Sequence, residues 1–237
     1  MNPRIQLTLS LITLLFFGVM AVVGFQHAKA APPAPEIIER EELQNWQYQV
    51  VQESKDYVSA RVDYSRDSYE ALRQYAIVQA SLVQGLRKDG IDQLFISVTF
   101  RRPLPIVEFR EWAKAHNMRV DSFMIRVKSP DGRAVTVGGV PTNGQIVEDD
   151  HLQRILQRVV AHGATDVQGI FSADGVSSIT SYSKISTSKE VFISDVTRSV
   201  ILHRLAKKHP TIQLQAQSII IPSPFSRMEE LGLDKFQ

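Results

Sequence analysis

A long apolar run without charge stands near the start of the chain. It covers the 21 residues from Ile5 to Phe25. As a helix rising about 1.5 Å per residue, such a run is about 31 Å long, which matches the ~30 Å hydrocarbon core of a membrane. The run predicts either a retained membrane anchor or a signal peptide, because Ala28-Lys29-Ala30 supplies a small-x-small cleavage site.

The flanks of this run indicate its orientation. Arg4 and the free amine precede it, and positive charge marks the cytoplasmic flank of membrane segments. We expect residues 1–30 to be a signal-anchor or signal peptide, followed by a Pro/Ala linker at 31–35. The chain is then a single-pass membrane protein with its C-terminal domain outside the cytoplasm, or a secreted protein if cleaved after Ala30.

Residues 36–89 have another pattern. They contain no proline, and their first glycine is Gly85. Apolar residues recur there at a 4-3 spacing that is typical of a helix face, and the first of them are Trp46, Val50, Tyr57, Ala60 and Tyr64. The segment predicts a helical stalk or hairpin, packed on its own domain or paired with a partner as a coiled coil.

From residue 90 to 237, β-branched and aromatic runs alternate with amphipathic ones. The expected strands are 94–100, 119–127, 133–140, 167–171 and 191–196. The expected helices are one with Phe109 and Trp112 on one face, a stripe within 152–160, a turn at Tyr182, and 197–208. Asn117 is expected to end the first helix in the left-handed conformation. The order predicts an α+β domain: a ferredoxin-like antiparallel sheet with helices on one face.

One segment resembles a known family. Val167–Val196 reads VQGIFSADGVSSITSYSKISTSKEVFISDV. It resembles the second half of the propeptide-like inhibitors of subtilisin-type proteases, in which a strand V-x-G-F, a helix with spaced apolar residues and a closing strand V-x-x-V-D-x build part of a ferredoxin-like fold. The residues at similar positions are Val167, Gly169, Ile179, Ile185, Val191 and Val196. The resemblance implies the fold more than protease inhibition, because a helix is expected where a tail would have to enter the protease cleft.

The predicted layout also resembles a class of machines. A short N-terminus, one span, a helical stalk and a compact ferredoxin-like domain are similar to the bitopic platform proteins of type IV pilus and type II secretion systems. This resemblance rests on architecture alone and on no residue motif. It implies an envelope protein that assembles with others.

Charge and composition exclude several classes of function. The formal charge of +2 comes from Arg4 and Lys29, because residues 1–30 contain no acidic residue and the remainder is formally neutral. A nucleic-acid binder that relies on a bulk positive field is therefore not expected. The chain has no cysteine, which excludes thiol catalysis, disulfides and thiolate metal sites.

The densest group of potential metal ligands is Glu148-Asp149-Asp150-His151. Consecutive side chains on a helix point about 100° apart and do not converge on one ion. Acidic residues that begin a helix explain the group more simply. We predict no metal and no cofactor.

Candidates for a hydrolase are present but scattered. They are Ser172, Ser177, Ser178, His162 and Asp174. The Ser172-Ala173-Asp174-Gly175 segment lacks the Gly-x-Ser-x-Gly elbow, and turn chemistry is its simpler role. A catalytic site would have to be assembled from distant residues, with Asp149, His151, Asp174 and Asp195 as the best combination, so no catalytic residue is predicted.

Two short basic groups offer patches for anionic partners or ordinary solvated faces. They are Arg101-Arg102 beside Arg110, and Lys207-Lys208 with His209. The sequence as a whole predicts a non-enzymatic, membrane-tethered, extracytoplasmic protein-interaction module of the cell envelope. Its expected partner is another envelope protein or a second copy, bound through the helical stalk. The alternative is a secreted hydrolase.

Overall fold

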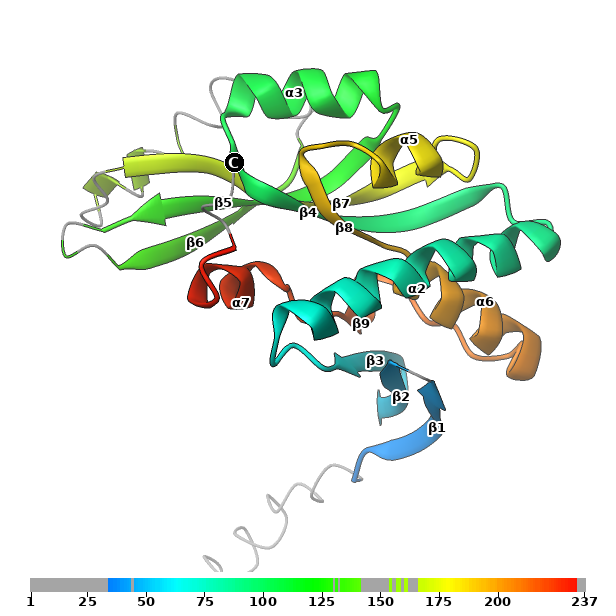
Figure 1. The fold of residues 1–237 in the computed structure, drawn as a ribbon. Helices are drawn as coiled ribbons and strands as arrows, with labels where there is room; N and C mark the ends of the chain where they lie inside the picture. Colours follow the sequence, from blue (N-terminus) through cyan, green and yellow to red (C-terminus); the bar gives the residue numbers. More distant parts are fainter. Residues whose placement is uncertain are drawn as a thin grey trace, which may run out of the picture. The chain divides into compact units, whose positions relative to one another are not determined.

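The computed structural model describes residues 34–43, 45–129, 131, 133–141, 166–233 and, in addition, 154, 157, 158, 160 and 161. The chain divides into two units, Met1–Pro35 and Glu36–Gln237. All elements below belong to the second unit. Its ribbon is drawn in Figure 1.

A four-stranded sheet begins this unit. Its strands lie in the order β1-β2-β3-β9, antiparallel except for the short parallel pair of β3 and β9. The bounds are Glu36–Leu43 for β1, Trp46–Ser54 for β2, Tyr57–Tyr64 for β3 and Ile219–Ile220 for β9. Trp46, Tyr48 and Val50 point into the core, while Gln47 and Gln49 between them are partly exposed on the other face. This alternation is that of a sheet with one buried face.

The helical stalk predicted for residues 36–89 is wrong. Three strands occupy 36–64, and only α2, Tyr69–Lys88, is a helix. A spacing of four places residues on one face of a strand as well as of a helix, so Trp46 and Val50 fitted both patterns. The predicted coiled coil is corrected too, because α2 buries Leu72 and Tyr75 within its own chain.

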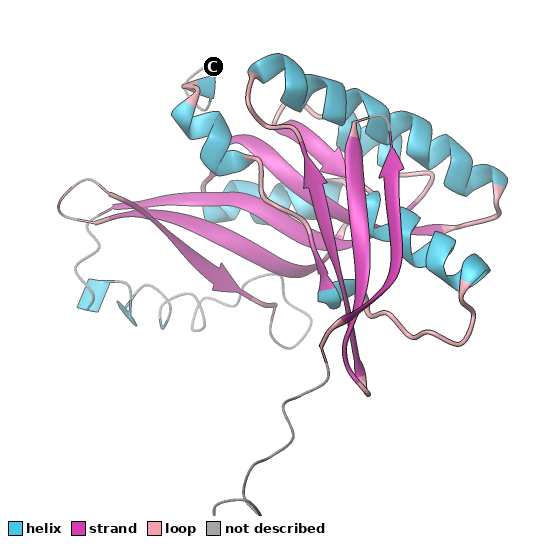
Figure 2. Cartoon of the chain, turned by 90° about the horizontal axis from the view of Figure 1, so that it is seen from below, coloured by secondary structure: helices cyan, strands magenta, loops and turns pink. Residues whose placement is uncertain are grey.

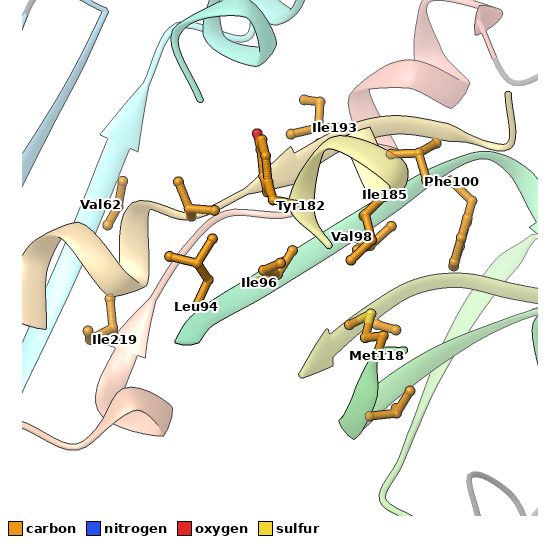
Figure 3. Packing of buried hydrophobic residues seen from close by; sticks show 14 of the residues in the cluster. Val62, Leu94, Ile96, Val98, Phe100, Met118, Tyr182, Ile185, Ile193 and Ile219 are labelled. Carbon is orange, nitrogen blue, oxygen red and sulfur yellow. The ribbon is translucent and has the colours of Figure 1, made fainter. Parts of the chain in front are cut away.

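The second sheet has five strands in the order β6-β5-β7-β4-β8, with every neighbouring pair antiparallel. The bounds are Gln93–Leu104 for β4, Arg119–Lys128 for β5, Ala134–Gly139 for β6, Asp166–Ser178 for β7 and Val191–Asp195 for β8. Figure 2 shows its strands running in a direction clearly different from those of the four-stranded sheet. Figure 3 shows buried residues of both sheets, among them Val62 and Ile219 of the four-stranded sheet and Leu94 and Ile96 of β4.

Helices cover both faces of the five-stranded sheet. The remaining helices are α3 (Ile106–Ala115), α5 (Tyr182–Ser186), α6 (Thr197–Lys208), the 3-10 turn Ala216–Ser218 and α7 (Phe225–Glu230). α3 and α5 lie on one face, and α2, α6 and α7 lie toward the other (Figure 1). The predicted ferredoxin-like sheet with helices on one face is therefore wrong. Because helices cover both faces of this sheet, consecutive residues of β4 are buried: Val98, Thr99 and Phe100 are all in the interior. This burial on both faces explains why the sequence of β4 is nearly continuously apolar.

The prediction of a single-pass membrane protein is corrected for the described part of the chain. There, no helix is both long and apolar enough to cross a membrane. α2, the longest, carries the exposed Arg73, Arg87 and Lys88. The predicted anchor 5–25, the cleavage site after Ala30 and most of the stripe within 152–160 lie outside the described residues.

Candidate functional site

Of the best combination suggested for a hydrolase site, the structure describes Asp174 and Asp195 and brings these two close to each other. Asp149, His151 and His162 lie outside the described residues. Asp174 on β7 and Asp195 on β8 both stand opposite Ser97, on the two sides of β4. The fold therefore places these two carboxyl groups on one face of the sheet.

Asp195 belongs to a buried hydrogen-bond network. Its Oδ2 accepts from Tyr75 Oη at 2.5 Å, and its Oδ1 accepts from the backbone N–H of Thr197 at 2.7 Å. Gln79 Oε1 accepts from the N–H of Val196 at 2.9 Å. Burial raises the pKa of Asp195. The network ties α2 to the junction of β8 and α6, which is a structural role.

Asp174 is partly exposed and held by neighbours in the sheet. It accepts from Ser97 Oγ at 2.5 Å and from Ser122 Oγ at 3.1 Å, and Arg198 NH1 lies 3.3 Å from its Oδ1. A carboxylate so engaged positions α6 on the sheet.

The described histidines have other partners. His203 Nε2 lies 2.7 Å from Asp89 Oδ2, His209 Nε2 lies 3.6 Å from Glu39 Oε2, and His116 stacks on Trp112. The described residues also hold no group of three or more His, Cys, Asp or Glu side chains suited to a metal ion.

The predicted basic patches are engaged in ion pairs. Lys207 Nζ lies 2.9 Å from Asp89, and Lys208 Nζ lies 2.7 Å from Glu39 Oε1. Tyr48 Oη donates to that same Glu39 oxygen at 2.8 Å, and burial raises the pKa of this phenol. In the other patch, Arg102 pairs with Glu108 at 3.1 Å. These cations hold their own chain together and offer little to an anionic partner.

The described residues form an open groove of about 790 Å³. It lies where the β1–β2 turn and the end of β3 meet the first turns of α2. Trp46 and Tyr64 line it and are 3% and 5% exposed, which places them at its floor. Ser68 begins α2 here, because its side chain accepts from the N–H of Ala71 at 3.1 Å.

The groove carries an excess of negative charge. Its acidic lining residues are Glu42, Asp63, Asp67 and Glu70, against the single cation Arg66. Their partners within the chain are weak or neutral: Glu42 lies 3.6 Å from Arg40, and Asp63 lies 3.4 Å from the Gln47 amide. Arg66 itself lies over the Tyr64 ring at 5.6 Å.

One wall of the groove is held by the C-terminal helix α7. Arg227 Nε donates to the carbonyl of Arg66 at 3.1 Å, and its NH2 group donates to that of Asp67 at 3.1 Å. Tyr64 Oη donates to the carbonyl of Pro222 at 2.7 Å. The loop and these partners are about 160 positions apart in the sequence, so no local pattern could have revealed them.

α7 is in turn fixed to the five-stranded sheet. Arg126, buried on β5, pairs with Glu229 and donates to Thr136 Oγ1 at 2.9 Å. The Phe225 ring stacks on Phe171 with centroids 4.5 Å apart, and the Arg126 guanidinium lies over both rings. α7 thus connects the groove to the other sheet.

A second recess of about 310 Å³ lies beside α3. It is smaller than the groove at Trp46, and Ser188 Oγ, which accepts from Trp112 Nε1 at 2.9 Å, donates to its lining residue Glu190 at 2.6 Å. The groove at Trp46 is therefore the better candidate site.

Comparisons with known proteins add no relative. No family model, no curated protein and no solved structure matches the chain.

Proposed function

We propose that this chain is a non-enzymatic binding module whose groove receives a positively charged, extended segment of a protein partner. The observation that carries the proposal is the excess of carboxylates around an open groove with an aromatic floor. Its volume of about 790 Å³ lies within the range of established ligand sites.

The shape and the charge of the groove favour such a segment. An open recess admits a chain that passes through it, whereas small ligands are usually enclosed. Glu42 comes from the end of β1, Asp67 from the loop before α2 and Glu70 from the first turn of α2, so carboxylates are supplied by both sides. Arginine forks pair with carboxylates in two parallel hydrogen bonds, and aromatic surfaces accept cations.

The catalytic alternative has weaker support. In its best described combination, Asp174 and Asp195 around Ser97, the carboxylates accept hydrogen bonds from Tyr75, Thr197 and Ser122, and Asp174 pairs with Arg198. The groove, by contrast, holds carboxylates whose partners within the chain are neutral or weak: Glu70 accepts from the Gln74 amide at 2.6 Å and lies 3.8 Å from Arg73. Binding therefore explains more of the surface than catalysis does.

The test is a titration of the chain with labelled peptides, followed by fluorescence anisotropy. We expect a peptide rich in Lys and Arg to bind, and a Glu-rich peptide of equal length to bind far less. Asp63→Asn and Glu70→Gln should each weaken binding roughly 2- to 5-fold, and added salt should weaken it further.

The matched control is Glu111→Gln, which removes one carboxylate from the recess beside α3. It should leave the affinity unchanged. Equal affinity for the basic and acidic peptides, or an equal loss in Glu111→Gln, would contradict the proposal.

A further inference from the structure

The outer strand of the five-stranded sheet, β6, is accessible. Ala134, Val135, Thr136 and Gly138 are exposed, Val135 by 43%. Its sequence AVTVGG has no charge and no proline. Such an edge presents a row of backbone donors and acceptors to another strand.

The other edge strands among the described residues are short or protected: β9, at one edge of the four-stranded sheet, has only 2 residues, and very short edge strands offer little to pair with. β1 bears Glu36, Arg40 and Glu42 on its exposed positions, and its pairing with β2 shifts between Ile37 and Glu39. Charges and bulges of this kind keep other strands away. β8, at the far edge of the five-stranded sheet, is almost wholly buried and contacts α2 and α5.

We propose that two copies of this chain associate through β6, as antiparallel strands around a two-fold axis perpendicular to the sheet. The two sheets would then continue as one of ten strands. This axis places the same face of both sheets on the same side. Residues that stand opposite each other must therefore both be even-numbered or both be odd-numbered, because side chains alternate between the two faces along a strand. Centred on Thr136, this pairing sets Val135 of one copy opposite Val137 of the other.

The chemistry of β6 favours a second copy over another occupant. An uncharged strand meets its own copy without any repulsion between like charges. Opposed β-branched residues and a Thr–Thr pair are favourable across antiparallel strands. Six residues form less than a standard interface, so the association should be weak and dependent on concentration.

The absence of cysteine allows a clean test by cross-linking. In the full chain, Thr136→Cys places one thiol at the expected centre of the pairing, and a short bifunctional thiol reagent should give a covalent dimer. Ile37→Cys, 57% exposed on the protected edge β1, is the matched control and should give none above background.

A second substitution separates strand pairing from general adhesion. Val135→Lys in the Thr136→Cys chain sets charge against the facing strand and should reduce the cross-linked dimer by about tenfold. Val107→Lys, at a residue 64% exposed on α3, should leave it unchanged. Circular dichroism melting of each variant confirms that it is folded. Equal cross-linking at positions 136 and 37, or no effect of Val135→Lys, would overturn the proposal.

Discussion

The two sheets differ in how much of their surface is covered. β2 and β3 bury one face and present glutamine, arginine and aspartate on the other. β4 lies under α3 and α5 on one side and above α2 and α6 on the other, and its central residues are buried on both faces. The sheet with one bare face also bears the groove, whereas the covered sheet is accessible mainly along β6.

This difference in coverage determines which surfaces of the molecule a partner can reach. The five-stranded sheet forms the covered body of the molecule. The four-stranded sheet is joined to it by α2 and α7 and carries the acidic groove at the end where β1, β2 and β3 meet α2. The contacts that join the two sheets include the hydrogen bonds around Asp195 and the contacts of α7.

Substitutions of single residues on β4 and β2 should show the largest difference between the two sheets. Ile96→Ala on β4 removes a fully buried side chain and should lower the free energy of unfolding by about 2–5 kcal/mol. Thr99→Ala, buried toward the opposite face of β4, should cost about 1–2 kcal/mol through its lost packing. Gln49→Ala, on the bare face of β2, should change it by less than about 0.5 kcal/mol. Denaturant unfolding measures all three, and a large effect at Gln49 would refute the one-faced description.

The Asp195 network should be nearly as important. Asp195→Ala leaves two buried donors, the Tyr75 hydroxyl and the Thr197 N–H, without their acceptor. The expected loss is about 2–4 kcal/mol in the free energy of unfolding. Tyr75→Phe, which removes one donor and fills the same space, should cost less and serves as the matched comparison.

The pH dependence of stability should reflect the same residue. Burial raises the pKa of Asp195 in the folded chain. Between its unfolded and folded pKa values, the folded state keeps a proton that the unfolded state has lost, so the stability falls as the pH rises through this window. Asp195→Asn cannot titrate, and the difference between the two unfolding curves against pH should isolate this contribution. A difference that rises with pH would show the opposite shift.

The contacts of α7 should affect the site more than the fold. Arg227→Gln removes the hydrogen bonds to the carbonyls of Arg66 and Asp67. We expect a stability loss of only about 1 kcal/mol, together with a threefold or greater loss of affinity for the basic peptide. Arg102→Gln, which removes an arginine from an exposed ion pair away from the groove, is the control. An unchanged affinity of Arg227→Gln for the basic peptide would show that the contacts of α7 do not contribute to binding in the groove.

Part of the fold was visible in the sequence because local chemistry determines it. The strand at 94–100, the hairpin of β5 and β6, the helix 197–208 and the left-handed Asn117, with φ of 51°, are confirmed. Each depends on β-branched content, turn residues or caps within a few positions. Pro210, for example, ends its helix within two residues.

The errors arose where two periods share the same residues. Trp46 and Val50 suit a helix and a strand, and the alternate residue Tyr48 was the signal that distinguished them. The helices on the second face could not be inferred, because order along the chain does not say which side of a sheet a helix covers. The groove depends on Arg227 and Pro222, whose contacts with residues 64–67 exist only in the folded chain.

The location of peptide binding tests the central claim most directly. Amide chemical shifts of the isotopically labelled chain would be recorded by NMR during titration with the Lys- and Arg-rich peptide. We predict that the shifts move at residues 42–47 and 63–71, which surround the groove, and stay constant at the recess beside α3. Changes centred elsewhere, or none at saturating peptide, would contradict the account.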